Sequence, residues 1–253
     1  MNFPAIPPVV PLRDRLPTRL TPFVNYALIA ANIAGFLWER SLIGQGVQAD
    51  RVLLVYGLVP ARLFMDPAAT FVTVFTSMFM HDPTNLLHLA GNMLFLWIFG
   101  DNVEDAMGHG RYLFYYLLGG ICAAAAQTVA DPTSYIPMVG ASGAISAVLA
   151  AYCFLYPRSP VTVLNPIPIL WIFFGFFLQF PAWLVIAEFF LVNLWSALTQ
   201  SAQGGVAFLA HVGGFVGGAL LLRPFMSGRI RVDEYARWRQ WAQRRGEAPH
   251  DAW

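Results

Sequence analysis

The stretch MVGASGAISAVLAAYCFLYP, residues 138–157, is almost entirely small or apolar, yet a hydroxyl, Ser142, lies near its start. A helix needs roughly 20 residues to cross about 30 Å of hydrocarbon, so this stretch predicts a membrane helix. Gly140 and Gly143 flank the serine and permit close approach of backbone or substrate. Free N–H groups at a helix N-terminus favour developing negative charge. A serine in a membrane helix can also simply bond its own backbone, so its role depends on which residues reach it.

Composition identifies an integral membrane protein. Of the 253 residues, 57% are hydrophobic and 11% are charged, whereas soluble domains carry about 25% charged residues. The net charge of +1 gives no indication of a nucleic-acid partner. The two cysteines, Cys122 and Cys153, lie in apolar runs and are interpreted as buried hydrophobes, not as a disulfide.

Hydropathy predicts an all-α membrane protein with six transmembrane helices. The connection at 43–84 is long, and its apolar pieces are too short to span, which suits a partly membrane-embedded first loop. Residues 161–178, which contain Pro166 and Pro168, are expected to lie at the inner interface or to extend the fifth helix. The predicted spans are about 22–42, 85–103, 112–130, 142–155, 179–198 and 205–222.

The arginines predict the orientation. If both termini are cytoplasmic, only Arg40, Arg51 and Arg62 lie outside and the other arginines lie inside, a strong positive-inside bias. No secretory signal is expected, because prolines interrupt the first 20 residues. The predicted organisation is a mobile Pro-rich cytoplasmic arm at 1–21, a six-span domain at 22–225, and a basic cytoplasmic tail at 226–253 that is either a surface helix or solvated.

Polar side chains inside membrane helices are costly and therefore mark candidate sites. His88 and Asn92 lie four residues apart, on one face of the second span. His211 lies about six residues into the sixth span, near its outer end, in the stretch AHVGGFVGGALL, where Gly213 and Gly217 overlap with the pair Gly214 and Gly218. Such small faces let helices approach closely.

The small face of the fourth span matches that of the sixth, so the two are expected to pack and bring His211 to Ser142. The imidazole would take the serine proton during attack on a carbonyl and then protonate the leaving amine. The Ser142 backbone N–H, His88 and Asn92 would stabilise the oxyanion. No third carboxylate is evident, so a Ser–His dyad is predicted.

At these residues the sequence resembles the rhomboid family of intramembrane serine proteases. The matching pieces are HLAGN (88–92), GASGA (140–144) and AHVGGFVGG (210–218), in order along the chain. NVED (102–105) resembles the family's Val-Glu element, which makes Glu104 a structural cap in a loop. MFMHD (78–82) makes His81 a supporting histidine.

The resemblance implies a rhomboid-like bundle of the bacterial type, in the bacterial inner membrane. It implies cleavage of other proteins' transmembrane segments, which reach the site sideways from the lipid bilayer, with no metal and no cofactor. The sequence departs from the family pattern at Val72-Thr73, where a Trp-Arg pair is expected, and at Ser146, where some members carry a tyrosine that stacks on the histidine.

Three alternatives stay open from the residues alone. One is a non-catalytic rhomboid-like protein that binds membrane helices. Another is a small transporter or channel lined by His88, Asn92 and His211. The last is a metal site built from His81, His88 and His211, which would lack a carboxylate or cysteine ligand at suitable depth. The sequence does not predict the substrate or the oligomeric state.

Overall fold

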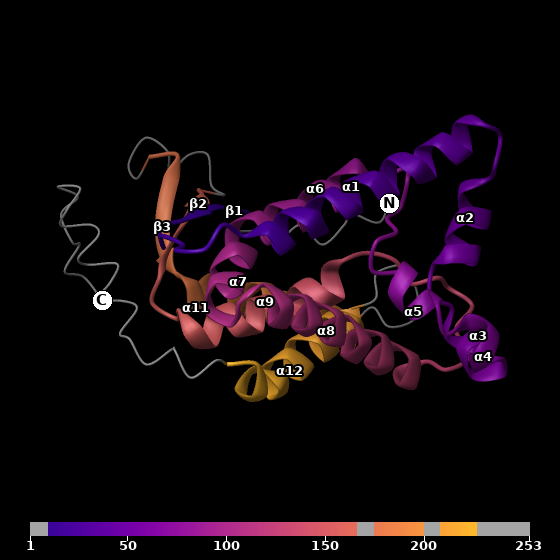
Figure 1. Cartoon of the computed structure of the whole chain (residues 1–253). Helices are drawn as coiled ribbons and strands as arrows, with labels where there is room; N and C mark the ends of the chain where they lie inside the picture. Colours follow the sequence, from indigo (N-terminus) through magenta and orange to yellow (C-terminus); the bar gives the residue numbers. More distant parts are fainter. Residues whose placement is uncertain (1–9, 166–174, 200–207, 227–253) are drawn as a thin grey trace.

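The protein is mostly helical, and its helices form one elongated bundle with a small β-sheet at one end (Figure 1). The computed structural model describes residues 10–165, 175–199 and 208–226. The basic tail expected at 226–253 lies almost wholly outside the described residues.

The first long helix, α1 (Phe23–Gly44), matches the first predicted span closely. A chain of short helices follows and gathers at the end of the bundle opposite the sheet (Figure 1). Prolines occupy the first position of two of them, where the missing N–H costs nothing. These helices are α2 (Ala49–Tyr56), α3 (Pro60–Met65), α4 (Pro67–Thr70) and α5 (Thr73–Thr76).

The second long helical run is one rod with a π-turn inside it. It comprises α6 (Leu86–Phe95), the π-turn η1 (Leu96–Gly100) and α7 (Asp101–Met107). Gly108 ends the rod with φ of +82°, a backbone conformation that favours glycine. The next helix, α8 (His109–Ala130), begins directly after it.

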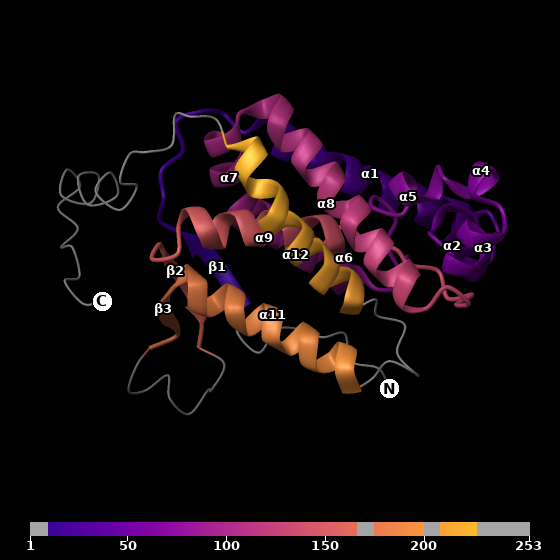
Figure 2. The ribbon, with the colours of Figure 1, turned by 90° about the horizontal axis from the view of Figure 1, so that it is seen from below.

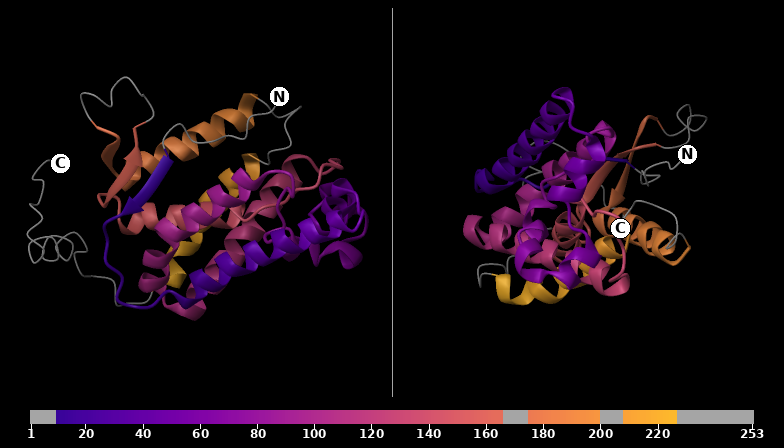
Figure 3. Two further views of the ribbon diagram at one scale, coloured as in Figure 1. Left: turned by 90° about the horizontal axis from the view of Figure 1, so that it is seen from above. Right: turned by 90° about the vertical axis from the view of Figure 1, so that its right-hand side faces the viewer.

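The centre of the bundle is α9 (Ser142–Leu155), which is buried along nearly all of its length. Helix α12 (Phe208–Phe225) packs against both α8 and α9, while α11 (Ala182–Thr199) lies at the margin (Figure 2). Two further views show the same marginal position of α11 (Figure 3).

The sheet corrects two expectations. Strand β1 (Val10–Asp14) pairs antiparallel with β2 (Pro160–Leu164), which pairs with β3 (Phe177–Pro181). The arm predicted to be mobile therefore includes a docked strand. Residues 161–164 and 177–178 lie in strands and do not extend a helix, whereas a position of this segment at the inner interface stays a prediction. Prolines are tolerated here because β1 and β3 are edge strands and Pro160 is the first residue of β2.

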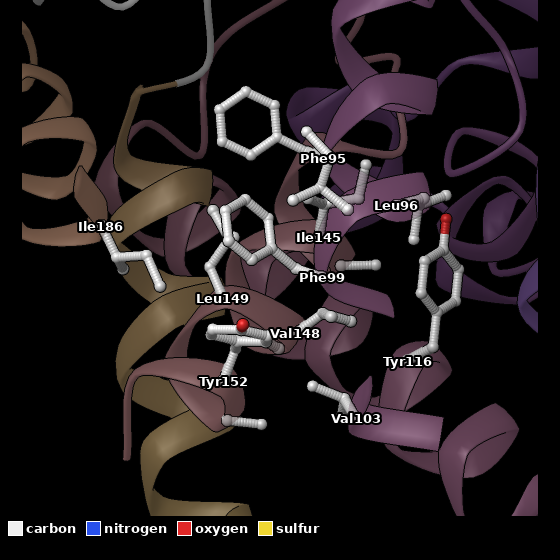
Figure 4. Close-up of a cluster of buried hydrophobic side chains, with 14 of the residues drawn as sticks. Phe95, Leu96, Phe99, Val103, Tyr116, Ile145, Val148, Leu149, Tyr152 and Ile186 are labelled. Carbon is white, nitrogen blue, oxygen red and sulfur yellow. The ribbon is translucent and has the colours of Figure 1, made fainter. Parts of the chain in front are cut away.

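The core lies between α6–α7, α8, α9 and α11. Aromatic and branched side chains from these helices interlock around α9; they include Phe95, Phe99, Val148, Leu149, Tyr152 and Ile186 (Figure 4). The rings of Phe99 and Tyr152 meet edge to face at 4.8 Å, a favoured aromatic geometry. This packing fixes α9 against the rod α6–α7, and so fixes the residues that each carries.

Within the described residues, three helical segments are long and apolar enough to cross a membrane: Leu86–Met107, His109–Ala130 and Phe208–Phe225. Helices α9 and α11 contribute shorter apolar segments, Ser142–Leu155 and Ala182–Val192. The protein is thus a helical membrane protein, and the six-span count expected from the sequence stays a prediction.

Candidate active site

Ser142 is the first residue of α9, and a tight turn aims it. Gly140 has φ of +118°, which favours glycine, and its N–H donates to the Ser77 carbonyl at 2.9 Å. Just before it, Met138 forms an isolated β-bridge with Leu58. The approach to the serine is therefore tied to the short-helix segment and does not hang free as a loop.

His211 meets Ser142 directly. Its Nε2 lies 2.7 Å from Ser142 Oγ, although 69 residues separate the two along the chain. The contact follows from parallel packing of α9 and α12. A β-carbon at Gly214 would overlap the carbonyl oxygen of Gly143, and one at Gly218 would lie 2.5 Å from the Ala147 Cα. The two backbones touch because neither glycine carries a side chain.

The two overlapping glycine pairs of α12 face different helices. Gly214 and Gly218 face α9, whereas Gly213 and Gly217 face α8, where a β-carbon on Gly217 would lie 2.5 Å from Cβ of Cys122. The hydroxyl of Tyr115 on α8 lies 2.9 Å from the carbonyl oxygens of both Ala147 and Gly218. Helix α12 is therefore held in a groove between α8 and α9, which fixes the height of its histidine.

Aromatic rings surround His211. The ring of Phe189 on α11 lies 6.1 Å from the imidazole, and the ring of Phe208 lies 6.5 Å away, edge on. Ser146, at the position where a stacking tyrosine was considered, donates instead to the carbonyl of Ser142 at 2.8 Å. These two phenylalanines supply the packing that the sequence did not reveal.

His88 approaches the same position from α6. A β-carbon placed on Gly140 would lie 3.1 Å from His88 Nε2 and 3.6 Å from Ser142 Oγ. Both polar atoms therefore border the small volume that Gly140 leaves empty. The side chain of Asn85 caps α6 by accepting from the His88 N–H at 3.1 Å, which fixes the start of the helix.

Asn92 is buried one turn further along α6, and its Nδ2 lies 2.9 Å from His81 Nε2. Burial, with a smaller contribution from His88, lowers the pKa of His81 to about 3, so its ring is neutral. Because an amide nitrogen only donates, Nε2 of His81 accepts and the ring proton sits on Nδ1. His81 thus orients the amide and leaves its second N–H free for another acceptor.

A buried carboxylate that the sequence reading missed holds His81 in place. Glu39 on α1 accepts from the His81 backbone N–H, with both oxygens at 3.2 Å. An acidic residue in the predicted first span was the available signal, because such residues are costly in lipid. Gln127 was also missed; its side chain accepts from the Ala210 N–H at 3.2 Å, beside the histidine.

Glu104 lies in helix α7 and not in a loop as expected. Its carboxylate accepts from the N–H groups of Val24 and Asn25 at 3.0 and 2.7 Å, and it also contacts His109. These N–H groups belong to the first turn of α1, so Glu104 caps that helix. This contact secures the bundle and not the site.

The segment with Val72 and Thr73 in place of the expected Trp-Arg pair is anchored by other contacts. Thr76 donates its hydroxyl to the Tyr56 carbonyl at 2.6 Å, and Arg62 donates to the Leu54 carbonyl at 2.6 Å. The side chain of Val72 is 60% exposed and anchors nothing by itself.

In the described part of the chain, no three His, Cys, Asp or Glu side chains gather at distances suited to a metal ion. His81, His88 and His211 are thus not arranged as a ligand set. The polar side chains gathered around Ser142 are instead three imidazoles and one amide.

Comparison with known proteins identifies the class. The apolar helices define an integral membrane protein, and the family model described as "Rhomboid domain" matches residues 68–227. The chain belongs to the rhomboid family. Membership of this family points to proteolysis within the membrane.

Three relatives illustrate the range. "Rhomboid protease GluP" of Bacillus subtilis is 36% identical over 134 residues, 53% of this chain and 25% of that protein. "Rhomboid protein 1, mitochondrial" of Saccharomyces cerevisiae is 27% identical over 202 residues, 77% of this chain and 51% of that protein. "Presenilin-associated rhomboid-like protein, mitochondrial" of Homo sapiens is 33% identical over 82 residues, 32% of this chain and 22% of that protein.

The matches cover less than two thirds of these relatives' own lengths, down to 22% of the human protein. Both bacterial and mitochondrial proteins are among them, so the bacterial inner membrane expected from the sequence stays a prediction.

Proposed function

We propose that the protein is a serine endopeptidase that hydrolyses peptide bonds in or near transmembrane segments of other membrane proteins. Ser142 is the nucleophile and His211 the general base and acid. The 2.7 Å separation of Ser142 Oγ and His211 Nε2 carries this proposal, because proton transfer requires the two groups to be within hydrogen-bond reach.

The chemistry proceeds in two stages. In the first, Oγ attacks the carbonyl carbon of the scissile bond while its proton passes to Nε2 of His211. The tetrahedral intermediate then collapses, the C–N bond breaks, and Nε2 returns the proton to the leaving amine. In the second, His211 takes a proton from water, the hydroxide attacks the acyl-enzyme, and Oγ leaves as the protonated serine.

The oxyanion is stabilised from two sides. Ser142 begins α9, so its backbone N–H has no acceptor within the helix and is available to a developing oxyanion. His88 Nε2 borders the volume beside Gly140, and Asn92, which is held by His81, follows one turn further along the same helix. Gly140 keeps this volume free of a side chain, whereas Gly143 lets α9 pack closely on Ala123 of α8, and Gly214 and Gly218 set the height of the base.

In the membrane, we propose six spans with both termini cytoplasmic, formed by α1, the rod α6–α7, α8, α9, α11 and α12. The segment 45–84 is then the partly embedded first loop, and Ser142 and His211 lie in the outer half. The partners are the bilayer and transmembrane protein substrates that leave lipid to reach the site. The proposed chemistry requires no cofactor, and a nucleic-acid partner is not proposed.

The decisive test uses purified protein in proteoliposomes with a reporter membrane helix. Ser142→Ala and His211→Ala are each expected to lower cleavage at least 10³-fold, the order lost when one member of such a set is removed. Ser146→Ala, one turn away on the same helix, is the matched control and should cleave normally. A serine-reactive phosphonate should label the wild type and the control but not Ser142→Ala. Undiminished cleavage by either Ser142→Ala or His211→Ala would refute the assignment.

Asn92→Ala sharpens the oxyanion assignment. One oxyanion donor contributes about 3–4 kcal/mol where it acts alone, and less where donors are redundant. The variant should therefore cleave 10- to 100-fold more slowly with little change in KM. A raised KM with unchanged kcat would instead assign Asn92 to ground-state binding.

A further inference from the structure

Glu188 is a charged residue that the proposed mechanism does not use. It lies in α11, whose sequence AWLVIAEFFLVNLWSALT is otherwise uncharged. Both carboxyl oxygens are shielded from solvent, and neither makes a hydrogen bond. A carboxyl group in an apolar membrane helix is costly, so its retention calls for a partner that the described residues do not supply.

Glu188 lies at the depth of the candidate active site. The adjacent residue, Phe189, places its ring 6.1 Å from the imidazole of His211 and 5.3 Å from the ring of Phe95 on α6. One helical residue rises only about 1.5 Å. The backbone of Glu188 is therefore almost level with that of Phe189, which packs on the histidine.

The helical rotation defines the direction that Glu188 faces. Phe190 packs on Phe215 of α12 at 4.6 Å, whereas Phe189 faces α6 and the histidine. Each step back along a helix turns about 100°. Phe190 faces α12 and Phe189 is turned about 100° from it towards α6, so Glu188 is turned about another 100° in the same direction. Its side chain therefore starts on the face of α11 that lies past the contact with α6 and away from α12. Leu184 and Leu191, on the same flank, are 39% and 58% exposed.

Among the described helices, this flank borders a loosely packed side of the site. Helix α12 packs closely on α8 and α9, whereas α6 and α11 share few contacts beyond the Phe95–Phe189 pair. A membrane helix that reaches Ser142 between α6 and α11 would pass Glu188. Its side chains near the scissile bond would lie within reach of the carboxyl group.

We propose that Glu188 is a specificity-determining residue that binds a basic side chain, lysine or arginine, of the substrate close to the scissile bond. The inference rests on the proposed protease function. A lysine within a membrane helix costs about 2.5–3.5 kcal/mol in lipid. Transfer to a site with an unpaired carboxylate gives the ammonium a partner, and it gives the carboxylate a partner that the described residues do not supply.

A lysine scan of the reporter tests the proposal. Lysine is placed in turn at each of the four positions on either side of the scissile bond, with methionine at the same position as the apolar match. In the wild type, lysine at one or two positions is expected to raise kcat/KM about tenfold over methionine, mainly through KM. Glu188→Gln, which keeps size and polarity, should abolish the preference and cleave the methionine reporters within twofold of the wild type.

Charge reversal provides the second variant. Glu188→Lys should cleave reporters with glutamate faster than reporters with lysine at the substrate position where the wild type prefers lysine. A merely structural role for Glu188 would slow all reporters alike and could not reverse a preference. A lysine preference that survives in Glu188→Gln, or that exists at no position, overturns the proposal.

Binding without cleavage separates this inference from the proposed function. In Ser142→Ala protein, a fluorescent lysine-bearing membrane helix should bind about tenfold more tightly than its methionine match, and the added substitution Glu188→Gln should remove the difference. Equal binding of the two helices overturns the role of Glu188 even if Ser142 is catalytic. Conversely, a Glu188-dependent preference together with cleavage that persists in Ser142→Ala overturns the protease mechanism alone.

Discussion

Two helix–helix contacts flank the candidate active site, and they differ in how closely the helices approach. We call the contact between α9 and α12 the tight seam and the contact between α6 and α11 the loose seam. Between α9 and α12, Gly214 and Gly218 bring backbone against backbone, and Tyr115 bridges both helices. Between α6 and α11, the described contact is a pair of tilted phenylalanine rings at 5.3 Å. The first seam holds the distance between serine and histidine, while the second leaves the side of the site that a substrate would need. The site thus has closely packed helices, α9 and α12, on one side and loosely packed helices, α6 and α11, on the other.

Among substitutions at these two helix contacts, the largest effect is expected at the contact between α9 and α12. Gly214→Ala would place a methyl group on the carbonyl of Gly143, where only backbone movement can relieve the overlap. We expect a loss of about 1–3 kcal/mol in the free energy of unfolding and at least a tenfold loss of cleavage. Denaturant titration in mixed micelles measures the former.

Gly91→Ala is the matched control, since a β-carbon at Gly91 on α6 meets nothing within 4 Å. It should stabilise the helix by up to about 1 kcal/mol. Equal stability changes in the two variants would contradict the description of the α9–α12 seam.

Tyr115→Phe removes the hydroxyl that the carbonyls of Ala147 and Gly218 share. The expected loss is about 1–2 kcal/mol, because the one buried O–H donor that these two carbonyls share is removed. Tyr135→Phe serves as the comparison, since that side chain is 62% exposed and should change the unfolding free energy by less than about 0.5 kcal/mol. A neutral Tyr115→Phe would mean that glycine packing alone holds the seam.

The far end of the same helices offers a pH-dependent contrast. Asp14 in β1 accepts from the hydroxyl of Tyr152 and the amide of Asn102, at 2.6 and 2.8 Å. Burial, reinforced by Asp101, raises the pKa of Asp14 from 3.8 to about 8. Between these two values the folded state keeps a proton that the unfolded state has lost. The contribution of Asp14 to the free energy of unfolding therefore falls as pH rises from about 4 to about 8 and does not change further above pH 8.

The slope is at most about 1.4 kcal/mol per pH unit. Asp14→Asn keeps the shape and removes the titration, so its stability should lose this part of the pH dependence. Thermal unfolding monitored at pH 5, 6, 7 and 8 measures the difference between variant and wild type. Parallel curves for the two proteins would contradict the raised pKa.

The smallest effect is expected on the loose side. Leu191→Ala truncates a side chain that is 58% exposed on the flank of α11, so in micelles the free energy of unfolding should change by less than about 0.5 kcal/mol. A loss above 2 kcal/mol would show that α11 is packed as firmly as α12 and would remove the contrast.

The sequence predicted the tight seam well and the loose one poorly. Glycines spaced four apart in α12 and small residues in α9 are typical of membrane helices that pack closely together. The contact between the two helices could therefore be inferred from the sequence. Phe189 and Glu188 lie in a long apolar run whose hydropathy hides which face meets a neighbour. The directions of these two side chains depend on how α11 is rotated about its own axis against its neighbours, and amino-acid composition does not determine that rotation.

Strand β1 escaped prediction for a different reason. Its prolines favour irregular structure, and its partner lies far along the chain, so no local pattern marks it. Glu104 was expected to be a cap, but its acceptor role towards α1 depends on a helix start about 80 residues earlier. Long-range partners of this kind are visible only in three dimensions.

The pairing of β1 with β2 also sets an order of events during synthesis. Val10 pairs with Leu164, so about 150 residues must be made before the first strand finds its partner. At about 5–20 residues per second, the ribosome needs roughly 8–30 s for this stretch. The sheet therefore forms only after the helices between β1 and β2 have been synthesised. Its strand pairing joins the two ends of this part of the bundle late in folding.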